Sequence, residues 1–178
     1  LSGTAPDLTY TPNANYHGAD SFTFTVNDGT VDSAAATVSI TVNPINDAPV
    51  ANAQTLSVNE DGSLNVTLTG SDVEGSSLTF TAGMPAHGVL SGVAPNLVYT
   101  PAANYNGPDS FTFTVNDGTL DSAAATVSIT VDAVNDVPVA NAQSVSVNED
   151  GTLNITLTGS DVEVSSLNFA LADGPLHG

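Results

Sequence analysis

The chain has 178 residues, contains no Lys or Arg, and carries 19 Asp and Glu residues, for a formal net charge of −19 at pH 7. It lacks the basic surface that nucleic acids and anionic membranes require, so neither is expected as a partner. It also lacks Cys, which excludes disulfides and thiolate metal sites, and no apolar run is long enough for membrane insertion.

The first regular segments are residues 21–26 (Ser-Phe-Thr-Phe-Thr-Val) and residues 37–42 (Thr-Val-Ser-Ile-Thr-Val). Polar and apolar side chains alternate in both, and a period of two residues predicts half-buried β-strands. No segment has the pattern of an amphipathic helix. The sequence therefore predicts an all-β protein.

A short segment between Pro44 and Pro49 follows these strands. Proline restricts the backbone and donates no hydrogen bond, so this segment is expected to be a short, stiff linker between domains. Such linkers would hold successive domains in a rod.

Seven further alternating segments follow the linker, with turn signals such as Asp61-Gly62 and Asn116-Asp117-Gly118 between them. Seven short strands in fewer than about a hundred residues predict a Greek-key β-sandwich of immunoglobulin type. Five aromatic side chains are expected to fill its core: Phe80, Tyr99, Tyr105, Phe111 and Phe113. The expected strands lie near residues 50–58, 64–69, 77–82, 88–91, 96–100, 110–116 and 124–131.

The sequence repeats itself at an offset of 89 residues, and residues 1–42 and 90–131 are identical at 35 of 42 positions. Residues 1–45 therefore correspond to the C-terminal half of a repeat, 46–134 to a complete repeat, and 135–178 to the N-terminal half of a repeat. Two interpretations stay open. The chain is a window on a longer array, or half-domains of identical neighbouring chains complete each other in a fibre.

Most acidic residues recur at the same turns of each repeat. Strand ends of a Greek-key sandwich gather at two poles, so carboxylates far apart in sequence are expected to meet near the linkers. They would repel one another there unless a hard cation bound them. Ca²⁺ takes six to eight oxygen ligands at about 2.3–2.6 Å from carboxylates, amides and carbonyls, which predicts Ca²⁺ as the cofactor. For Asp117 and Asp121, a simple turn-forming role is the alternative.

Four motifs resemble those of cadherins. Residues 46–50 (Asn-Asp-Ala-Pro-Val) are similar to the inter-domain linker, and residues 58–61 (Val-Asn-Glu-Asp) resemble the Glu-bearing turn. Asp72-Val-Glu74 resembles the acidic pair after the second strand, and residues 115–118 resemble the Ala-x-Asp-x-Gly segment. The stretch at 99–111, Tyr-Thr-Pro-Ala-Ala-Asn-Tyr-Asn-Gly-Pro-Asp-Ser-Phe, is typical of bacterial cadherin-like repeats of the VCBS type, which occur in large secreted adhesins.

The resemblance implies a Ca²⁺ site at each linker. The implied ligands at the first linker are Asp20, Asn46, Asp47, Asp72, Glu74 and Asp117. The implied ligands at the second linker are Glu60, Asp109, Asn135, Asp136, Asp161 and Glu163, and Glu149 occupies the position of Glu60 in the next repeat. Asp109-Ser110 replaces an acidic-Arg-acidic motif, and Ala48 replaces a second linker Asn, so the resemblance implies fewer ions or weaker binding than in cadherins.

Together these features predict a structural or adhesive extender segment of a long extracellular or cell-surface protein. Its partners would be neighbouring repeats of the same protein. An enzyme is not expected, because no nucleophile-elbow motif is present and near-identical repeats do not resemble one tuned site. Two alternatives are the self-assembling filament subunit and a module that binds a glycan or a protein. The binding module would need an aromatic platform outside the repeated positions, and none is seen, since the chain has no Trp.

Overall fold

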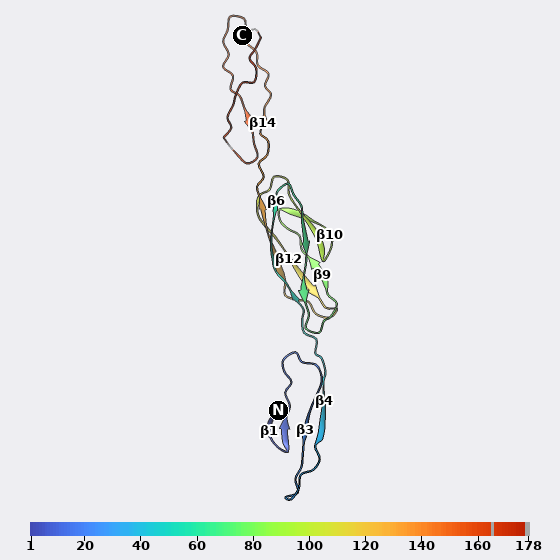
Figure 1. Cartoon of the computed structure of the whole chain (residues 1–178). Helices are drawn as coiled ribbons and strands as arrows, with labels where there is room; N and C mark the ends of the chain where they lie inside the picture. The colour runs from blue at the N-terminus through green and yellow to red at the C-terminus, as the bar shows by residue number, and fades with distance from the viewer. Residues whose placement is uncertain (165, 177–178) are drawn as a thin grey trace. The chain divides into compact units, whose positions relative to one another are not determined.

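The structure is a computed structural model that describes residues 1–164 and 166–176. Within these ranges it contains β-strands and no helix, as predicted (Figure 1). Accordingly, the described residues include no helix that could cross a membrane. The chain divides into two compact units, one of residues 1–52, 69–81 and 114–124 and the other of residues 53–68, 82–113 and 125–178.

The first unit contains three antiparallel strand pairs, β1–β2, β3–β4 and β5–β8. β3 and β4 contain the two alternating segments noted in the sequence. They pair with each other, with Phe22 opposite Val38. The strands are β1 (Ser2–Thr4), β2 (Asp7–Thr9), β3 (Gly18–Phe24), β4 (Ala36–Val42), β5 (Val50–Ala51) and β8 (Gly70–Ser71).

The second unit contains a three-stranded sheet in the order β10-β11-β7, a parallel pair of β6 with β13, and the short antiparallel pair β14–β15. Its strands are β6 (Gln54–Asn59), β7 (Leu64–Thr67), β10 (Gly88–Val93), β11 (Asn96–Pro101), β13 (Ala125–Asp132), β14 (Val139–Ala140) and β15 (Gly159–Ser160). Two strands have residues in both units and complete a four-stranded sheet in the order β6-β13-β12-β9: β9 (Thr79–Ala82) and β12 (Gly107–Asn116).

All seven strands expected in residues 46–134 are present, and the structure adds the short strand β8, which was not expected. One predicted strand needs correction. The predicted strand at 50–58 is two strands, β5 and β6, separated by Asn52 and Ala53. Val50 pairs with Ser71 of β8, whereas Gln54 pairs in parallel with Val127 of β13. The chain changes its hydrogen-bonding partner at the break, and an alternating pattern does not report which partner a strand has.

Buried apolar side chains concentrate in residues 46–134. Every second residue is buried in β13 and, from Asp109 onward, in β12, which is the period of a sheet with one inner face. Each large apolar side chain among them, such as Phe113 or Val127, contributes about 1.5–3 kcal/mol through burial. The buried set is Val66, Leu68, Leu97, Tyr99, Phe111, Phe113, Val115, Ala125, Val127, Ile129 and Val131.

Three of the five aromatic side chains expected in the core are buried, namely Tyr99, Phe111 and Phe113. Phe80 and Tyr105 are only half-buried. The ring of Tyr99 packs directly over Gly88, where an added Cβ would overlap the ring and lie 2.7 Å from the carbonyl oxygen of Thr100. A residue without a side chain is therefore required beside Tyr99.

Candidate functional site

Glu60 follows directly after the end of β6 and lies at the start of the second linker. Parallel pairing places Asn59 beside Asp132 at the end of β13. The backbone N–H of Glu60 donates to the carbonyl oxygen of Asp132 at 3.0 Å, and its Oε1 accepts from the N–H of Val134 at 2.7 Å. The sheet thus fixes the glutamate against the linker backbone.

The second carboxylate oxygen of Glu60 lacks a partner within the part of the chain that the structure describes. Glu60 is only 3% exposed, and its Oε2 is buried without a hydrogen-bond donor among the described residues. The chain has no Lys or Arg that could pair with this charge. A buried charge without a partner is strongly destabilising, whereas a hard cation would supply the missing interaction. The chemistry of this oxygen therefore fits a cation such as Ca²⁺.

The far side of the second linker has a matching arrangement. Glu163 Oε2 accepts the N–H of Asp136 at 2.9 Å, and Glu163 Oε1 is buried without a donor in the described part of the chain. Asp161 Oδ1 accepts the N–H groups of Glu163 and Val164 at 3.1 and 3.0 Å, which orients this turn. The linker amides at positions 134 and 136 therefore bond to Glu60 and Glu163, respectively. Each glutamate has one buried oxygen without a donor among the described residues.

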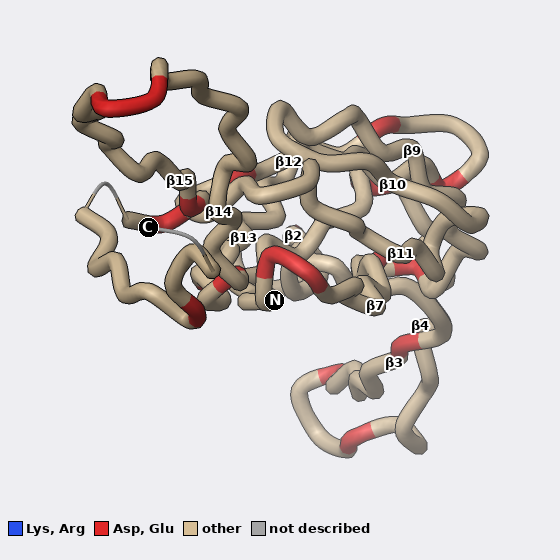
Figure 2. Tube along the Cα trace, turned by 90° about the horizontal axis from the view of Figure 1, so that it is seen from above, with Lys and Arg blue, Asp and Glu red and all other residues tan. Residues whose placement is uncertain are grey.

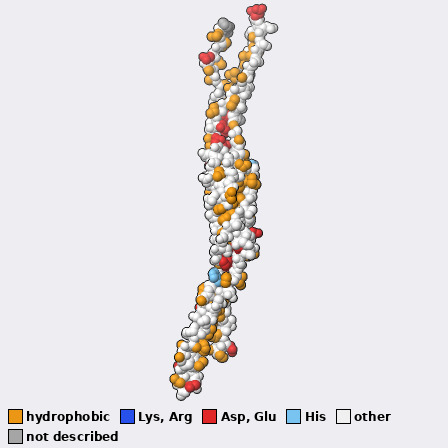
Figure 3. All heavy atoms as spheres, turned by 90° about the vertical axis from the view of Figure 1, so that its right-hand side faces the viewer, with side chains coloured by type: hydrophobic (Ala, Val, Ile, Leu, Met, Phe, Trp, Pro, Cys, Tyr) orange, Lys and Arg blue, Asp and Glu red, His pale blue; other side chains and the backbone are white. Residues whose placement is uncertain are grey.

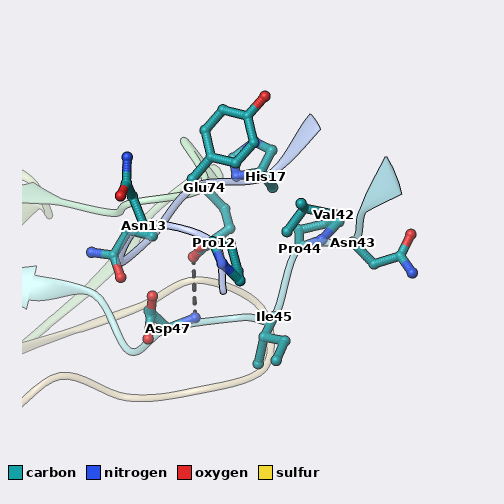
Figure 4. A pocket seen from close by; sticks show the side chains of 11 residues that line it. Pro12, Asn13, His17, Val42, Asn43, Pro44, Ile45, Asp47 and Glu74 are labelled. Atoms are coloured by element: carbon teal, nitrogen blue, oxygen red, sulfur yellow. Dashed lines mark hydrogen bonds between the residues drawn. The ribbon is translucent and has the colours of Figure 1, made fainter. Parts of the chain in front are cut away.

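The first linker repeats this geometry. Glu74 Oε2 accepts the N–H of Asp47 at 3.1 Å, the counterpart of the bond between Glu163 and Asp136 (Figure 4). Asp72 Oδ1 accepts the N–H of Ser76 at 2.8 Å, and Asp72 Oδ2 is buried with no donor among residues 1–164 and 166–176. Asp47 and Glu74 line a cavity of about 300 Å³ that His17 also lines.

Asp117 reaches the first linker through Asn46. The amide Nδ2 of Asn46 donates to Asp117 Oδ2 at 2.7 Å. The N–H of Leu120 and this Asn46 amide are the main donors that lower the pKa of Asp117 to about 2, and Thr119 adds two more hydrogen bonds. Asp117 is therefore both a turn residue and an ionised group bonded to the linker.

Asp109 has four protein donors instead of a linker contact. Its Oδ1 accepts the N–H groups of Ala86 and Ser110 at 3.0 and 2.8 Å, and its Oδ2 accepts the N–H of His87 at 3.0 Å and the hydroxyl of Tyr99 at 2.7 Å. Burial alone would raise the pKa of Asp109, but these hydrogen bonds outweigh burial and lower it. With four donors, the carboxylate has little capacity left for a metal ion.

Asp20, the counterpart of Asp109 in residues 1–45, is exposed and accepts the hydroxyl of Tyr10 at 2.8 Å and the N–H of Ser21 at 2.7 Å. Glu149, the counterpart of Glu60, is also exposed. The predicted ligand roles of Asp20, Asp109 and Glu149 stay predictions, and the bonds shown by the structure do not connect these residues to a linker.

Acidic residues lie at several turns of the chain (Figure 2). Within residues 1–164 and 166–176, however, no three His, Cys, Asp or Glu side chains lie close enough together to hold a metal ion. Ca²⁺ binding therefore stays a prediction. What supports it is the position of the three unpartnered buried oxygens, on Glu60, Asp72 and Glu163, because all three belong to the expected ligands.

Two polar features were not expected from the sequence. One is the buried hydrogen bond between Tyr99 and Asp109, and the other is the parallel stack of His87 on Tyr105, with ring centroids 4.1 Å apart. The first had a usable signal, because the same spacing recurs at Tyr10 and Asp20. The stack had none, since position 17, which also carries His, does not correspond to position 87 in the repeat.

Comparison with known families and structures identifies the fold. A family profile described as "Bacterial Ig domain" matches residues 1–41 and 46–130. The structure of human CDH23 EC21-23 is similar, with a TM-score of 0.53 at 19% identity, over 85% of this chain and 61% of that one. Human mucin-like protocadherin EC1-2 gives a TM-score of 0.50 at 22% identity, over 72% and 74%. The predicted immunoglobulin and cadherin-like β-sandwich fold is confirmed.

Two curated relatives come from Dictyostelium discoideum. Integrin beta-like protein B is 28% identical over 90% of this chain, and integrin beta-like protein A is 33% identical over 74% of it. The chain spans only 9% and 8% of the lengths of these two relatives.

Proposed function

Because the chain belongs to the family of bacterial Ig domains, we propose that it is an extender segment of an extracellular adhesive protein whose linkers are stiffened by Ca²⁺. The role is structural and not enzymatic. The observation that carries the proposal is Glu60 Oε2, a buried carboxylate oxygen without a donor among the described residues, in a chain with no Lys or Arg.

The arrangement of bonds explains how an ion would stiffen the chain. At each linker a backbone amide already bonds to a glutamate, either Glu74 or Glu163, through Oε2. A cation bound by the remaining carboxylate oxygens would add a second connection to the same linker. The residues that would hold it are Asn46, Asp47, Asp72, Glu74 and Asp117 at the first linker, and Glu60, Asn135, Asp136, Asp161 and Glu163 at the second.

The test is thermal unfolding of the chain and of Glu60→Gln, each in Ca²⁺ and in chelator. At a hundredfold excess over its dissociation constant, Ca²⁺ stabilises the parent by about 2.7 kcal/mol per site. Glu60→Gln should lose most of this gain. In chelator Glu60→Gln should be as stable as the parent or more stable, because the substitution removes a buried charge that has no counter-ion.

Two controls separate a specific site from general screening of the −19 charge. Asp61→Asn removes the same charge at the neighbouring exposed position, and it should keep the Ca²⁺ response of the parent. Mg²⁺ at equal concentration should stabilise less than Ca²⁺, because it loses its hydration shell reluctantly. Equal responses to both ions, or an unchanged response in Glu60→Gln, would contradict the proposal.

A further inference from the structure

The strand β10 lies at the edge of the three-stranded sheet in the complete repeat. It pairs with β11 on one side, and no strand of the described residues pairs with its other side. In an antiparallel ladder the backbone groups of alternate residues point to opposite sides of the strand. About half of the N–H and C=O groups of β10 therefore point away from β11, where a further strand could pair with them.

This edge lacks the usual protection against association. Proteins commonly protect a sheet edge with charged residues or proline, and residues 88–93 contain neither. Two apolar side chains of β10 are instead exposed, Val89 by 57% and Val93 by 82%. Figure 3 views the molecule from the side on which Figure 1 draws β10, and hydrophobic side chains are visible there in the middle part of the chain. The strand thus presents both unpaired backbone groups and apolar surface.

The sequence around β10 carries no negative charge. Residues 75–108, which include β9, β10 and β11, form the longest run without Asp or Glu in a chain of formal net charge −19. Two copies of this chain repel each other wherever their acidic turns approach, and the repulsion is weakest where acids are absent. A basic partner would gain no electrostatic attraction from an uncharged strand. The charge distribution therefore favours a second copy of this chain as the partner of β10.

The strand β10 is also complementary to itself. If two copies run antiparallel about a two-fold axis at Ser91, Val89 of each copy lies opposite Val93 of the other, and the two Ser91 residues face each other. All three positions are exposed and share one face of the strand, and pairs of β-branched side chains across strands stabilise a sheet. We propose that two copies of the chain associate through antiparallel pairing of their β10 strands in this register. The contact uses none of the residues expected to bind Ca²⁺.

Sedimentation equilibrium of the 178-residue chain over a range of concentrations, in high salt and chelator, tests the association. Salt screens the repulsion between the chains, and chelator removes cations that could bridge acidic residues. We expect the parent to form dimers and nothing larger. Val93→Asp should weaken the dimer by about tenfold or more, because it brings a charge against Val89 of the other copy. Val50→Asp is the matched control, since Val50 is also 57% exposed but lies in β5, and it should leave dimerisation unchanged.

A double variant tests the pairing of positions 89 and 93. Val89→Lys combined with Val93→Asp keeps the net charge of the parent and places opposite charges against each other at both contacts of the dimer. Within one chain the two positions lie about 13 Å apart along the strand, so the charges do not pair there. At moderate ionic strength the double variant should dimerise more tightly than Val93→Asp alone. A parent that stays monomeric at all concentrations, a Val93→Asp chain that dimerises like the parent, or a double variant no tighter than Val93→Asp would each overturn the proposal.

Disulfide cross-linking tests the register independently, because the chain has no Cys of its own. Opposite residues of paired antiparallel strands have Cα atoms about 4.5–5.5 Å apart, which is within the range of a disulfide. Ser91→Cys should therefore form a disulfide-linked homodimer on oxidation in air. Val89→Cys alone should cross-link much less, since its two copies would lie about 13 Å apart along the strands, whereas its mixture with Val93→Cys should form a heterodimer. Equal cross-linking of Ser91→Cys and of Val89→Cys alone would mean unspecific contact and would overturn the register.

Discussion

The back half of the repeat occurs twice in this chain, at residues 1–45 and 90–134, with nearly the same sequence and the same strands. β1 and β2 pair in the register of β10 and β11, and β3 and β4 pair in the register of β12 and β13. Burial nevertheless differs, because inner-face side chains are exposed or half-buried in the first copy and buried in the second. Strand pairing is thus encoded within the half, whereas the core is not.

The front half behaves differently. The short pair β14–β15 in residues 135–178 matches β5–β8 in position and register. Residues 141–158, all of which the structure describes, contain no strand, although their counterparts form β6 and β7. Each of these two strands hydrogen-bonds to a strand of the back half, whereas β5 and β8 bond to each other. A strand forms here only where its hydrogen-bonding partner is present.

The largest expected effect is on hydrogen exchange of the backbone amides. Backbone amides of β6 that bond to β13 should exchange only when the repeat unfolds, which slows them by on the order of a thousandfold or more. Amides of residues 143–148, which have the same position in the repeat, should exchange almost as fast as those of an unfolded peptide. Equal protection of the two segments would refute the asymmetry between the halves.

Core substitutions should show the next largest effect. Phe113→Ala should lower the free energy of unfolding by about 3–5 kcal/mol, because it leaves a cavity in a closed core. Phe24→Ala, which makes the same change 89 residues earlier, should change it by about 0.5 kcal/mol or less, since this side chain is exposed. Denaturant unfolding of dilute samples gives both values.

Comparing Phe24 with Phe113 also shows which result would contradict the expected difference in stability. If Phe24→Ala were as destabilising as Phe113→Ala, Phe24 would be packed in a closed core, which would contradict its exposure in the structure.

Much of this fold was predictable because alternation reports burial on one face of a sheet. The strands near 110–116 and 124–131 were expected, and β12 and β13 occupy them. Alternation does not report which strand is the hydrogen-bonding partner, so the change of partner at Asn52 and the missing strands in 141–158 could not be predicted. Both depend on which segment is available to pair.

The candidate sites were predictable to a smaller extent. Resemblance to cadherin motifs singled out Glu60, Asp72 and Glu163, whose free buried oxygens are the main structural support for a cation. The same resemblance gave Asp109 a ligand role, yet its oxygens already accept four protein donors. Two of these donors are amides of the loop before β10, and a linear motif holds no information about when such a loop closes over a carboxylate.

The smallest expected effect contrasts Asp109 with Asp20, which occupy the same position in the repeat. Asp109→Asn should destabilise the chain at pH 7 by about 1–3 kcal/mol, because an amide cannot accept from all four donors and adds an N–H that faces them. Asp20→Asn is the control and should have little effect, since Asp20 is exposed and has only two of these donors.

The dependence of this difference on pH follows from the lowered pKa of Asp109. A carboxylate whose pKa is lower in the folded state stabilises that state above its unfolded pKa of about 3.9, and the gain disappears as the pH falls through the folded pKa. The stability difference between the parent and Asp109→Asn should therefore be constant from pH 7 to about pH 5 and shrink below about pH 4. Comparing the two chains at each pH cancels the relief of charge repulsion on protonation of the other carboxylates, which both share. A difference that stays constant down to pH 2 would show that the four donors do not favour the ionised form of Asp109.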